Sequence, residues 1–457
     1  MVAFFFYCAL VLLGVESGLC SGDDRTQWVD SSKGIHAFLT FDSKTTAGNI
    51  EKHGNLVDYV WGSSVSHVQN WRKSTNPNIV LSYYMPFSRD PKPHVTGKPP
   101  TGLPWWQENH PDLILYQCDR KTPAWECFAG EGCSHKNVPL DLTNTKTLDY
   151  QMEAGVRPAM KLGYNAVALD NYGLKNQWKA CGSFKGKGGA WVQLYDEVSP
   201  STDPQYGEDV LDWTKRAVER IHDETGLLVI PNYSGMDLGD SKVLRVGNLT
   251  DGILAESGFT SWNPIPNTTS MHRPPPMTNP KKFELQVRYV RNLQRYGKGF
   301  FAINEWGPGP DYDLNPTCWA TNITRAVRQF VVASFMMTNG RSSGVMLTCI
   351  QCYGGGCGGV GNFSVWPPEF QANVGVPVGE PMKNATSGVW TRLYSNAISI
   401  VNPSQTAKVR VELPVDDDWV DLYGSKVVDH VATLPEASGL VLMKEGARGT
   451  AASRTSR

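Results

Sequence analysis

The 457-residue chain lacks several features that define whole classes of protein. Its 43 Lys and Arg residues nearly balance 44 Asp and Glu residues, and the formal net charge is −1. No charge excess therefore draws the chain to nucleic acid or to an anionic membrane. Beyond the amino-terminal segment, no apolar run is long enough to span a bilayer. We expect no nucleic-acid partner and no membrane association of the mature chain.

Three familiar site motifs are incomplete. The Cys349-x-x-Cys352 pair lacks a second cysteine pair at zinc-binding spacing. The glycine-rich stretch CYGGGCGGVGN, which begins at Cys352, lacks the Gly-Lys-Ser/Thr ending of a phosphate loop. NYSGMD, which begins at Asn232, does not match the Gly-x-Ser-x-Gly elbow of serine hydrolases. We expect no metal and no cofactor.

Aromatic residues, by contrast, are abundant. Phe, Trp and Tyr make up 11% of the chain, and 15 residues are Trp. Many Trp and Tyr side chains on a nearly neutral protein suit a neutral ligand with apolar faces, and sugars are the obvious class. The alternative is that the Trp residues are simply core, and composition alone favours that alternative.

The first 22 residues, MVAFFFYCALVLLGVESGLCSG, predict a secretory signal peptide over 1–22. The apolar run is short for a membrane span, and the small residues after it suit signal peptidase. An uncleaved anchor is the alternative. Six glycosylation sequons agree with a secreted glycoprotein; they begin at Asn232, Asn248, Asn267, Asn322, Asn362 and Asn384.

Eight cysteines remain after removal of the signal, and most should form disulfides in an oxidising compartment. At least one bond is expected within the set Cys318, Cys349, Cys352 and Cys357. Their loops follow the seventh and eighth expected strands, which are neighbours in a closed barrel.

Eight apolar, β-rich runs predict the main fold. They lie at 35–43, 58–64, 78–87, 165–171, 226–234, 252–259, 299–306 and 343–350. Near-continuous apolar strands are typical of a parallel sheet covered by helices, and amphipathic helical stretches lie between several of them. Eight strand–helix units predict a TIM (β/α)8 barrel over residues 30–368. The long insertion between the third and fourth strands is expected to form a capping loop or subdomain.

The carboxyl-terminal part has a different pattern. Short alternating segments punctuated by Pro, Gly, Asn and Ser predict a small antiparallel β-sandwich domain over residues 369–445. Residues 446–457 contain no core positions and are expected to be a disordered tail.

Polar residues stand at the ends of the expected barrel strands, where TIM-barrel active sites lie. Asp170 and Glu256 end the fourth and sixth strands, and Glu305 ends the seventh. Paired carboxylates are what glycosidic cleavage needs, because one must protonate the leaving group while the other acts ionised. Repulsion between two close acids separates their pKa values and so assigns these roles.

The other polar and aromatic candidates are expected to bind substrate. Asn side chains can hold sugar hydroxyls, and aromatic rings can stack on sugar faces. Trp105 and Trp106 either stack on sugars at the rim or merely pin a loop. We expect the sequon at Asn232 to be unoccupied, since a glycan there would block the cleft. The expected substrate-binding set is Asp42, Tyr83, Asn171, Asn232, Asn304, Trp105 and Trp106, with Tyr84 as an alternative to Tyr83 at the strand end.

The segments GYNAVALDN, PLDLTNTKTLDYQMEAGV and ILAESGF resemble TIM-barrel glycoside hydrolases related to endo-α-1,4-polygalactosaminidase, within the α-glycosidase-like barrels. The carboxyl-terminal segments resemble the accessory β-domain of such enzymes, and the resemblance extends to about residue 445. It implies that Asp170 is the nucleophile and Glu256 the acid/base. A helix cap for Asp170 and a salt bridge for Glu256 are the structural alternatives.

The pair Asn304-Glu305 departs from this pattern. It is similar to the Asn-Glu pair of another group of retaining glycosidases, but there the pair ends the fourth strand, whereas here it ends the seventh. Glu305 is therefore a third carboxylate that either orients substrate or replaces Glu256 as the acid. Two functions stay open: a secreted, retaining glycosidase, or an inactive barrel that acts as a carbohydrate-binding or structural glycoprotein. The sequence does not predict an oligomeric state.

Overall fold

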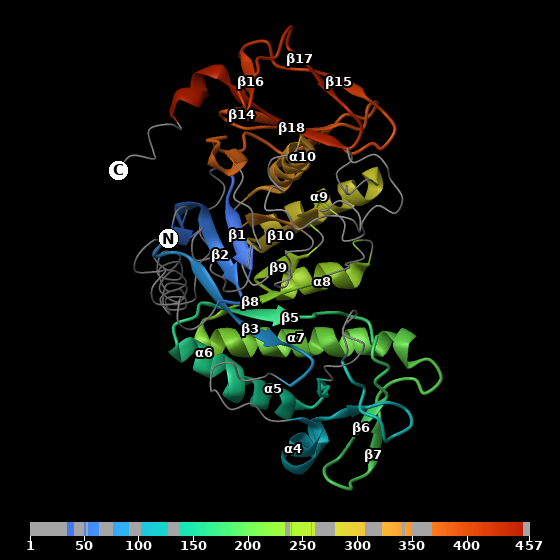
Figure 1. Ribbon diagram of the computed structural model, residues 1–457. Helices are drawn as coiled ribbons and strands as arrows, with labels where there is room; N and C mark the ends of the chain where they lie inside the picture. The colour runs from blue at the N-terminus through green and yellow to red at the C-terminus, as the bar shows by residue number, and fades with distance from the viewer. Residues whose placement is uncertain are drawn as a thin grey trace, which may run out of the picture.

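Eight parallel strands form a barrel in the order β8-β5-β3-β2-β1-β11-β10-β9. The computed structural model describes residues 34–40, 50–51, 54–63, 76–90, 102–126, 137–233, 238, 240–256, 258–260, 279–306, 322–340, 343–349 and 368–450. The barrel strands are β1 (Ala37–Thr40), β2 (Val57–Trp61), β3 (Val80–Pro86), β5 (Ala166–Asp170), β8 (Leu228–Pro231), β9 (Gly252–Ala255), β10 (Gly299–Trp306) and β11 (Ser343–Cys349). A parallel bridge between Asn232 and Leu254 joins the two end strands, so the barrel is nearly closed. The predicted TIM barrel is confirmed (Figure 1).

Side chains alternate between the barrel interior and the outer core under the helices. On β5, Ala166 and Ala168 belong to the interior cluster, whereas Val167 and Leu169 belong to the outer core. This two-residue period is the geometry of every β-strand. Asp170, at the end of β5, is in phase with the interior residues.

The outer helices begin and end at residues that the sequence marks. In α7 (Pro204–Thr225), the side chain of Asp203 accepts a hydrogen bond from the backbone of Gln205, and Gly226 ends the helix at φ +67°. The other long helices are α8 (Ser241–Leu249), α9 (Pro280–Arg295) and α10 (Asn322–Thr338). Among the described residues, no helix is long and apolar enough to cross a membrane.

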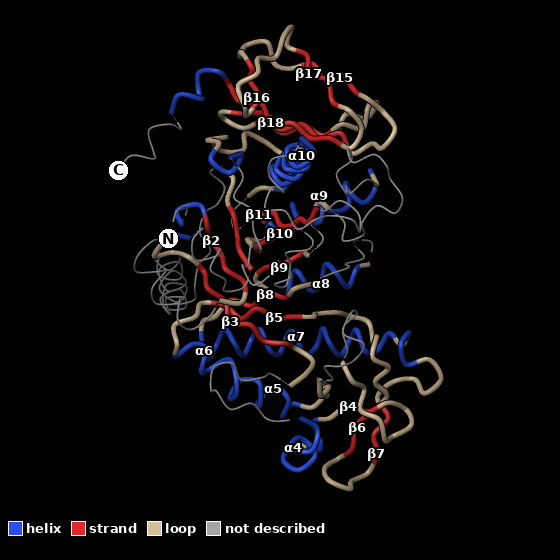
Figure 2. The backbone as a smooth tube through the Cα atoms, viewed as in Figure 1, coloured by secondary structure: helices blue, strands red, loops and turns tan. Residues whose placement is uncertain are grey.

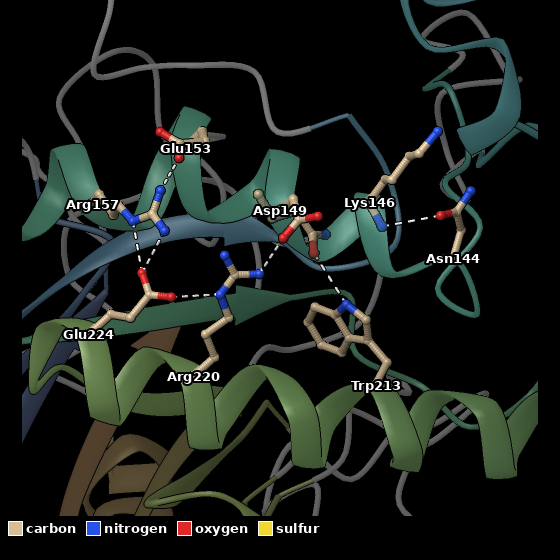
Figure 3. Close-up of polar contacts among 9 residues, drawn as sticks. Asn144, Lys146, Asp149, Glu153, Arg157, Trp213, Arg220 and Glu224 are labelled. Atoms are coloured by element: carbon tan, nitrogen blue, oxygen red, sulfur yellow. Dashed lines mark hydrogen bonds and ion pairs between the residues drawn. The ribbon is translucent and has the colours of Figure 1, made fainter.

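A second helical layer packs against α7. It consists of α5 (Thr145–Gln151), the π-helical turn η3 (Met152–Val156) and α6 (Arg157–Lys161). Ion pairs join the two layers: Arg220 Nη1 lies 2.5 Å from Asp149 Oδ1, and Arg157 Nη2 lies 2.6 Å from Glu224 Oε2 (Figure 3). Both pairs are partly exposed to solvent, so each contributes at most about 1 kcal/mol.

The insertion subdomain combines two segments of the chain. The helix α4 (Gly102–Asn109) and strand β4 (Leu115–Tyr116) follow β3, whereas β6 (Gly182–Phe184) and β7 (Trp191–Gln193) follow β5. Together the strands form the sheet β4-β6-β7, which lies apart from the barrel strands (Figure 2). A disulfide between Cys118 and Cys181 joins the two segments. The prediction of a subdomain from the first segment alone was therefore incomplete.

The carboxyl-terminal part consists of antiparallel sheets, as predicted. The larger sheet has the order β12-β13-β14-β18-β16, and the smaller pairs β15 with β17. Its strands are β12 (Met382–Lys383), β13 (Trp390–Leu393), β14 (Ala397–Asn402), β15 (Val409–Glu412), β16 (Trp419–Asp421), β17 (Val431–Leu434) and β18 (Ser438–Lys444). The short helix η7 (Glu445–Thr450) follows β18. The boundaries 30–368, 369–445 and 446–457 stay predictions.

Candidate active site

Three of the predicted residues meet at the carboxyl ends of neighbouring strands. Asp170 ends β5, Asn232 follows β8, and Glu256 follows β9. The amide nitrogen Nδ2 of Asn232 lies 3.2 Å from Oδ1 of Asp170 and 2.8 Å from Oε1 of Glu256. Two oxygens that share one donor at these distances lie at most about 6 Å apart, within the range that paired glycosidase carboxylates use. The two acids therefore face one small volume.

The backbone fixes Asn232 between the two acids. Its N–H donates to the carbonyl of Leu169 at 2.7 Å, and its carbonyl accepts from the N–H of Tyr172 at 3.2 Å. The side chain is buried, with only 3% of the residue exposed. A buried amide held on both sides of its backbone has little freedom to turn, so it presents its N–H groups to the carboxylates in a fixed direction.

Asp170 is surrounded by hydrogen-bond donors. Asn171 Nδ2 donates to its Oδ2 at 2.6 Å, the hydroxyl of Tyr84 donates to the same oxygen, and Arg89 Nη2 lies 4.0 Å away. Asn171 has a φ of +56°, a left-handed conformation that Asn tolerates better than most residues. The strained turn directs the Asn171 amide back onto Asp170. Donors from three parts of the chain thus converge on one carboxylate.

Opposing effects act on the charge of Asp170. Burial raises its pKa, the hydrogen bond from Tyr84 lowers it, and the nearby charge of Glu256 raises it again. Arg89 and Asn232 lower it. The net pKa is raised, but the donors favour the ionised form. Burial and the charge of Asp170 raise the pKa of Tyr84, so this hydroxyl keeps its proton and donates it.

The tyrosine at the site is Tyr84, and the expected substrate contact of Tyr83 is not supported by its position. Tyr83 is 3% exposed in the outer core, where its ring packs edge-on against Tyr164 with centroids 5.7 Å apart. Tyr84 is in phase with Val80 on the interior side of β3. The two-residue period of the strand, applied from the interior residues, would have selected Tyr84.

Asn304 supports the fold and has no free group for a sugar hydroxyl. It is fully buried. Its Oδ1 accepts from the backbone of Phe259 at 2.6 Å, and its Nδ2 donates to the carbonyls of Ala302 and Met346. These bonds fix the chain after β9 against β10. The position of Asn304 does not support the expected substrate-binding role, because its amide bonds to backbone groups.

The two tryptophans of the insertion differ in burial. Trp106 is fully buried, and its ring packs against Tyr150 with centroids 5.0 Å apart. Trp105 is partly exposed and meets Trp106 edge-on at 5.4 Å. Stacking of Trp106 on a sugar is excluded by its burial, which favours the loop-pinning alternative for this residue. For Trp105, whose side chain is partly exposed, both alternatives stay open.

The remaining predicted residues fall outside what the structure describes. Asp42 lies outside the described residues, as does the side chain of Glu305, whose backbone pairs with Thr348. Of the four cysteines expected to contain a bond, Cys318, Cys352 and Cys357 lie outside, and Cys349 is described only in its backbone. In the described part of the chain, no group of three or more His, Cys, Asp or Glu residues is arranged to hold a metal ion.

Two functional candidates at the site were not predicted from the sequence. Arg89, which follows β3, lies 3.4 Å from the hydroxyl of Tyr84 and 4.0 Å from Asp170. Glu126, from the insertion, is buried beside Ser88 and interacts electrostatically with both Arg89 and Asp170. Neither residue stands in a recognisable motif. The only available signal was the position of Arg89 just after a barrel strand.

Comparison with known proteins identifies the architecture. No family model and no curated protein matches the chain. Trehalose-6-phosphate hydrolase of Bacillus licheniformis is 9% identical at a TM-score of 0.50, over 91% of this chain and all 100% of that one. An α-amylase of Malbranchea cinnamomea is 9% identical over 92% and 98% of the two chains, and isomaltulose synthase of Klebsiella sp. LX3 is 12% identical over 90% and 99%, each at a TM-score of 0.49. The chain thus has the barrel-and-sheet fold of the trehalose-6-phosphate hydrolase structure.

Proposed function

We propose that the protein is a retaining glycoside hydrolase that acts on a neutral oligo- or polysaccharide. The observation that carries this proposal is the Asn232 amide, which bridges Asp170 and Glu256 at the strand-end face of the barrel. Asp170 attacks the anomeric carbon and forms a covalent glycosyl ester, while Glu256 gives its proton to the departing oxygen. Glu256 then takes a proton from water, which hydrolyses the ester and releases the sugar.

Several contacts support these roles. The donors around Asp170 stabilise an anionic nucleophile and fix its direction of attack. The upper limit of about 6 Å between the nearest carboxylate oxygens agrees with direct attack, since retaining enzymes separate their carboxyl groups by about 5–5.5 Å. Within such barrels, the motifs around Asp170 and Glu256 favour the group related to endo-α-1,4-polygalactosaminidase.

A protein that binds carbohydrate without turnover is the alternative. A binding protein has no need to bury a carboxylate against the charge of a second one, because that arrangement costs stability. Asp170 and Glu256 lie in such an arrangement. This favours the enzyme, whose partner is a carbohydrate substrate.

Two isosteric substitutions test the mechanism after a panel of aryl glycosides and polysaccharides has identified a substrate. Asp170→Asn removes the nucleophilic charge and should lower kcat by several orders of magnitude without lowering the thermal midpoint. Glu256→Gln should impair substrates with poor leaving groups far more than activated aryl glycosides, which need little protonation.

Glu305→Gln is the control for the assignment of the acid. If this variant, and not Glu256→Gln, shows the leaving-group dependence, Glu305 is the acid. An α- or β-anomeric product that differs from the substrate configuration, measured by proton NMR, would show inversion and would change Asp170 from nucleophile to base.

We further propose that the protein travels the secretory route as a glycoprotein. Asn248, on α8, and Asn384, beside β12, are exposed and stand in sequons. The Cys118–Cys181 disulfide agrees with an oxidising compartment. Mapping of N-glycans on the chain expressed in a eukaryotic secretory cell tests this proposal.

A further inference from the structure

Glu126 is a carboxylate that the proposed reaction does not use, yet it lies buried near the site. Only 2% of the residue is exposed. The hydroxyl of Ser88 donates to Oε1 of Glu126, and the backbones of Glu126 and Asn137 exchange N–H···O bonds of 3.3 Å in both directions. The insertion subdomain therefore delivers this acid to the segment that follows β3.

The same segment carries Arg89. Its neighbours on either side are tied down: Leu140 N–H donates to the carbonyl of Ser88 at 2.8 Å, and Asp90 N–H donates to the carbonyl of Val138 at 3.0 Å. The Arg89 side chain is 11% exposed, and its guanidinium reaches Tyr84 and Asp170. Because the backbone is held on either side of Arg89, only rotation of its side chain can move the guanidinium.

More negative than positive groups act on Glu126. The groups that act electrostatically on Glu126 are Arg89 and Asp90 from the segment after β3 and Asp170 from β5, and Glu126 in turn acts on Tyr206 of α7. One guanidinium and two other carboxyl groups thus act on Glu126. Burial raises the pKa of Glu126 to about 7, the Ser88 hydrogen bond and Arg89 lower it, and the charges of Asp90 and Asp170 raise it.

We propose that Glu126 is a positioning residue for Asp170 that acts through Arg89. While Glu126 holds its proton, Arg89 remains against Tyr84 and Asp170. When Glu126 loses that proton, its carboxylate attracts the guanidinium away from them. The inference rests on the proposed function for its effect on rate, but the coupling of Glu126, Arg89 and Asp170 is a property of the folded protein alone.

The first test is the pH profile of kcat/KM. In the wild type, the rate should fall as pH rises through about 7, where Glu126 ionises. Glu126→Gln keeps an oxygen that accepts from Ser88 but cannot ionise, so the ratio of kcat/KM at pH 8 to that at pH 6 should rise several-fold over the wild type. An unchanged ratio in folded Glu126→Gln would overturn the proposal.

Two further variants keep this test decisive. Ser88→Ala removes a hydrogen bond that lowers the pKa of Glu126, so the fall in rate should move to higher pH. This result is expected even if Glu126→Gln fails to fold, and its absence contradicts the proposal. Glu153→Gln removes an equal charge from a side chain that is 69% exposed, and it should leave the profile unchanged.

The second test needs no substrate, so it separates this inference from the proposed function. Because the pKa of Glu126 is raised in the folded state, the thermal midpoint should fall as pH rises from about 4.5 to about 7. Glu126→Gln should lack that fall, and Asp170→Asn should reduce it, since the Asp170 charge raises the pKa of Glu126. An equal fall in all three proteins would overturn the proposal, whether or not the wild type hydrolyses a glycoside.

Discussion

At the scale of single residues, Asp170 accepts a hydrogen bond from Tyr84. The neighbouring residue, Tyr83, points its side chain in the opposite direction. Tyr84 donates to Asp170 from the interior side of β3. Tyr83, one position earlier, is buried in the outer core. The pair offers a matched comparison, because both substitutions to Phe remove one hydroxyl from the same strand.

Tyr84→Phe should raise the pKa of Asp170, because the lost hydrogen bond lowers it. A hydrogen bond to a charged group contributes about 1.5–3 kcal/mol, so its loss should shift this pKa measurably upward. An ionised nucleophile loses activity as pH falls through its pKa, so the acidic limb of the kcat/KM profile should move to higher pH. Tyr83→Phe should leave the limb in place, and an equal shift in both variants would refute the role of Tyr84.

The residues show what a sequence can and cannot reveal. Asp170, Asn232 and Glu256 were predictable because each follows an apolar strand, and strand ends meet at one face of a barrel. The two-residue period of β3 and β10 directs the side chains of Tyr83 and Asn304 away from the barrel interior, so a position near a strand end was not enough to predict their roles. Glu126 was not predictable, since only the folded insertion brings it to the segment after β3.

At the scale of elements, the insertion subdomain is assembled from two segments that flank β5. Its sheet pairs β4 with β6, and the disulfide between Cys118 and Cys181 spans 63 residues of sequence. The sequence predicted only the first segment, because the strands β6 and β7 are three residues each and carry weak patterns. The subdomain matters for the site because it supplies Glu126.

The double substitution Cys118→Ser and Cys181→Ser should destabilise the protein by about 4 kcal/mol, the value expected when a loop of this length is no longer closed in the unfolded chain. Urea unfolding followed by Trp fluorescence measures this difference. Reduction of the wild type should give at least this loss, because it also opens any bond among the other six cysteines of the mature chain, and the double variant should respond less to reductant. A double variant as stable as the oxidised wild type would contradict the expectation.

At the scale of the whole molecule, α10 joins the barrel to the carboxyl-terminal sheet, and Figure 1 shows the helix between them. Ser399 Oγ of β14 donates to the carbonyl of Ala333 at 2.9 Å. The buried guanidinium of Arg392 donates to the carbonyl of Met336, in the last turn of the helix, at 2.9 Å and to that of Asn339, just after it, at 2.6 Å. A cation at a helix carboxyl terminus is favourable, so the sheet both covers and caps α10.

The folded surface also determines which sequons can carry a glycan. Asn248 and Asn384 are exposed, whereas Asn232 is 3% exposed and directs its amide at Asp170 and Glu256. A glycan on that nitrogen would replace one of its hydrogens and could not fit between the two acids.

In protein secreted from a eukaryotic cell, digestion with peptide-N-glycosidase in H2(18)O should mark Asn248 and Asn384 by mass spectrometry and leave Asn232 unmarked. Asn248→Gln and Asn384→Gln should each remove one glycan mass. A folded protein that carries a glycan on Asn232 would contradict the site, and two unmodified exposed sequons would contradict the secretory route.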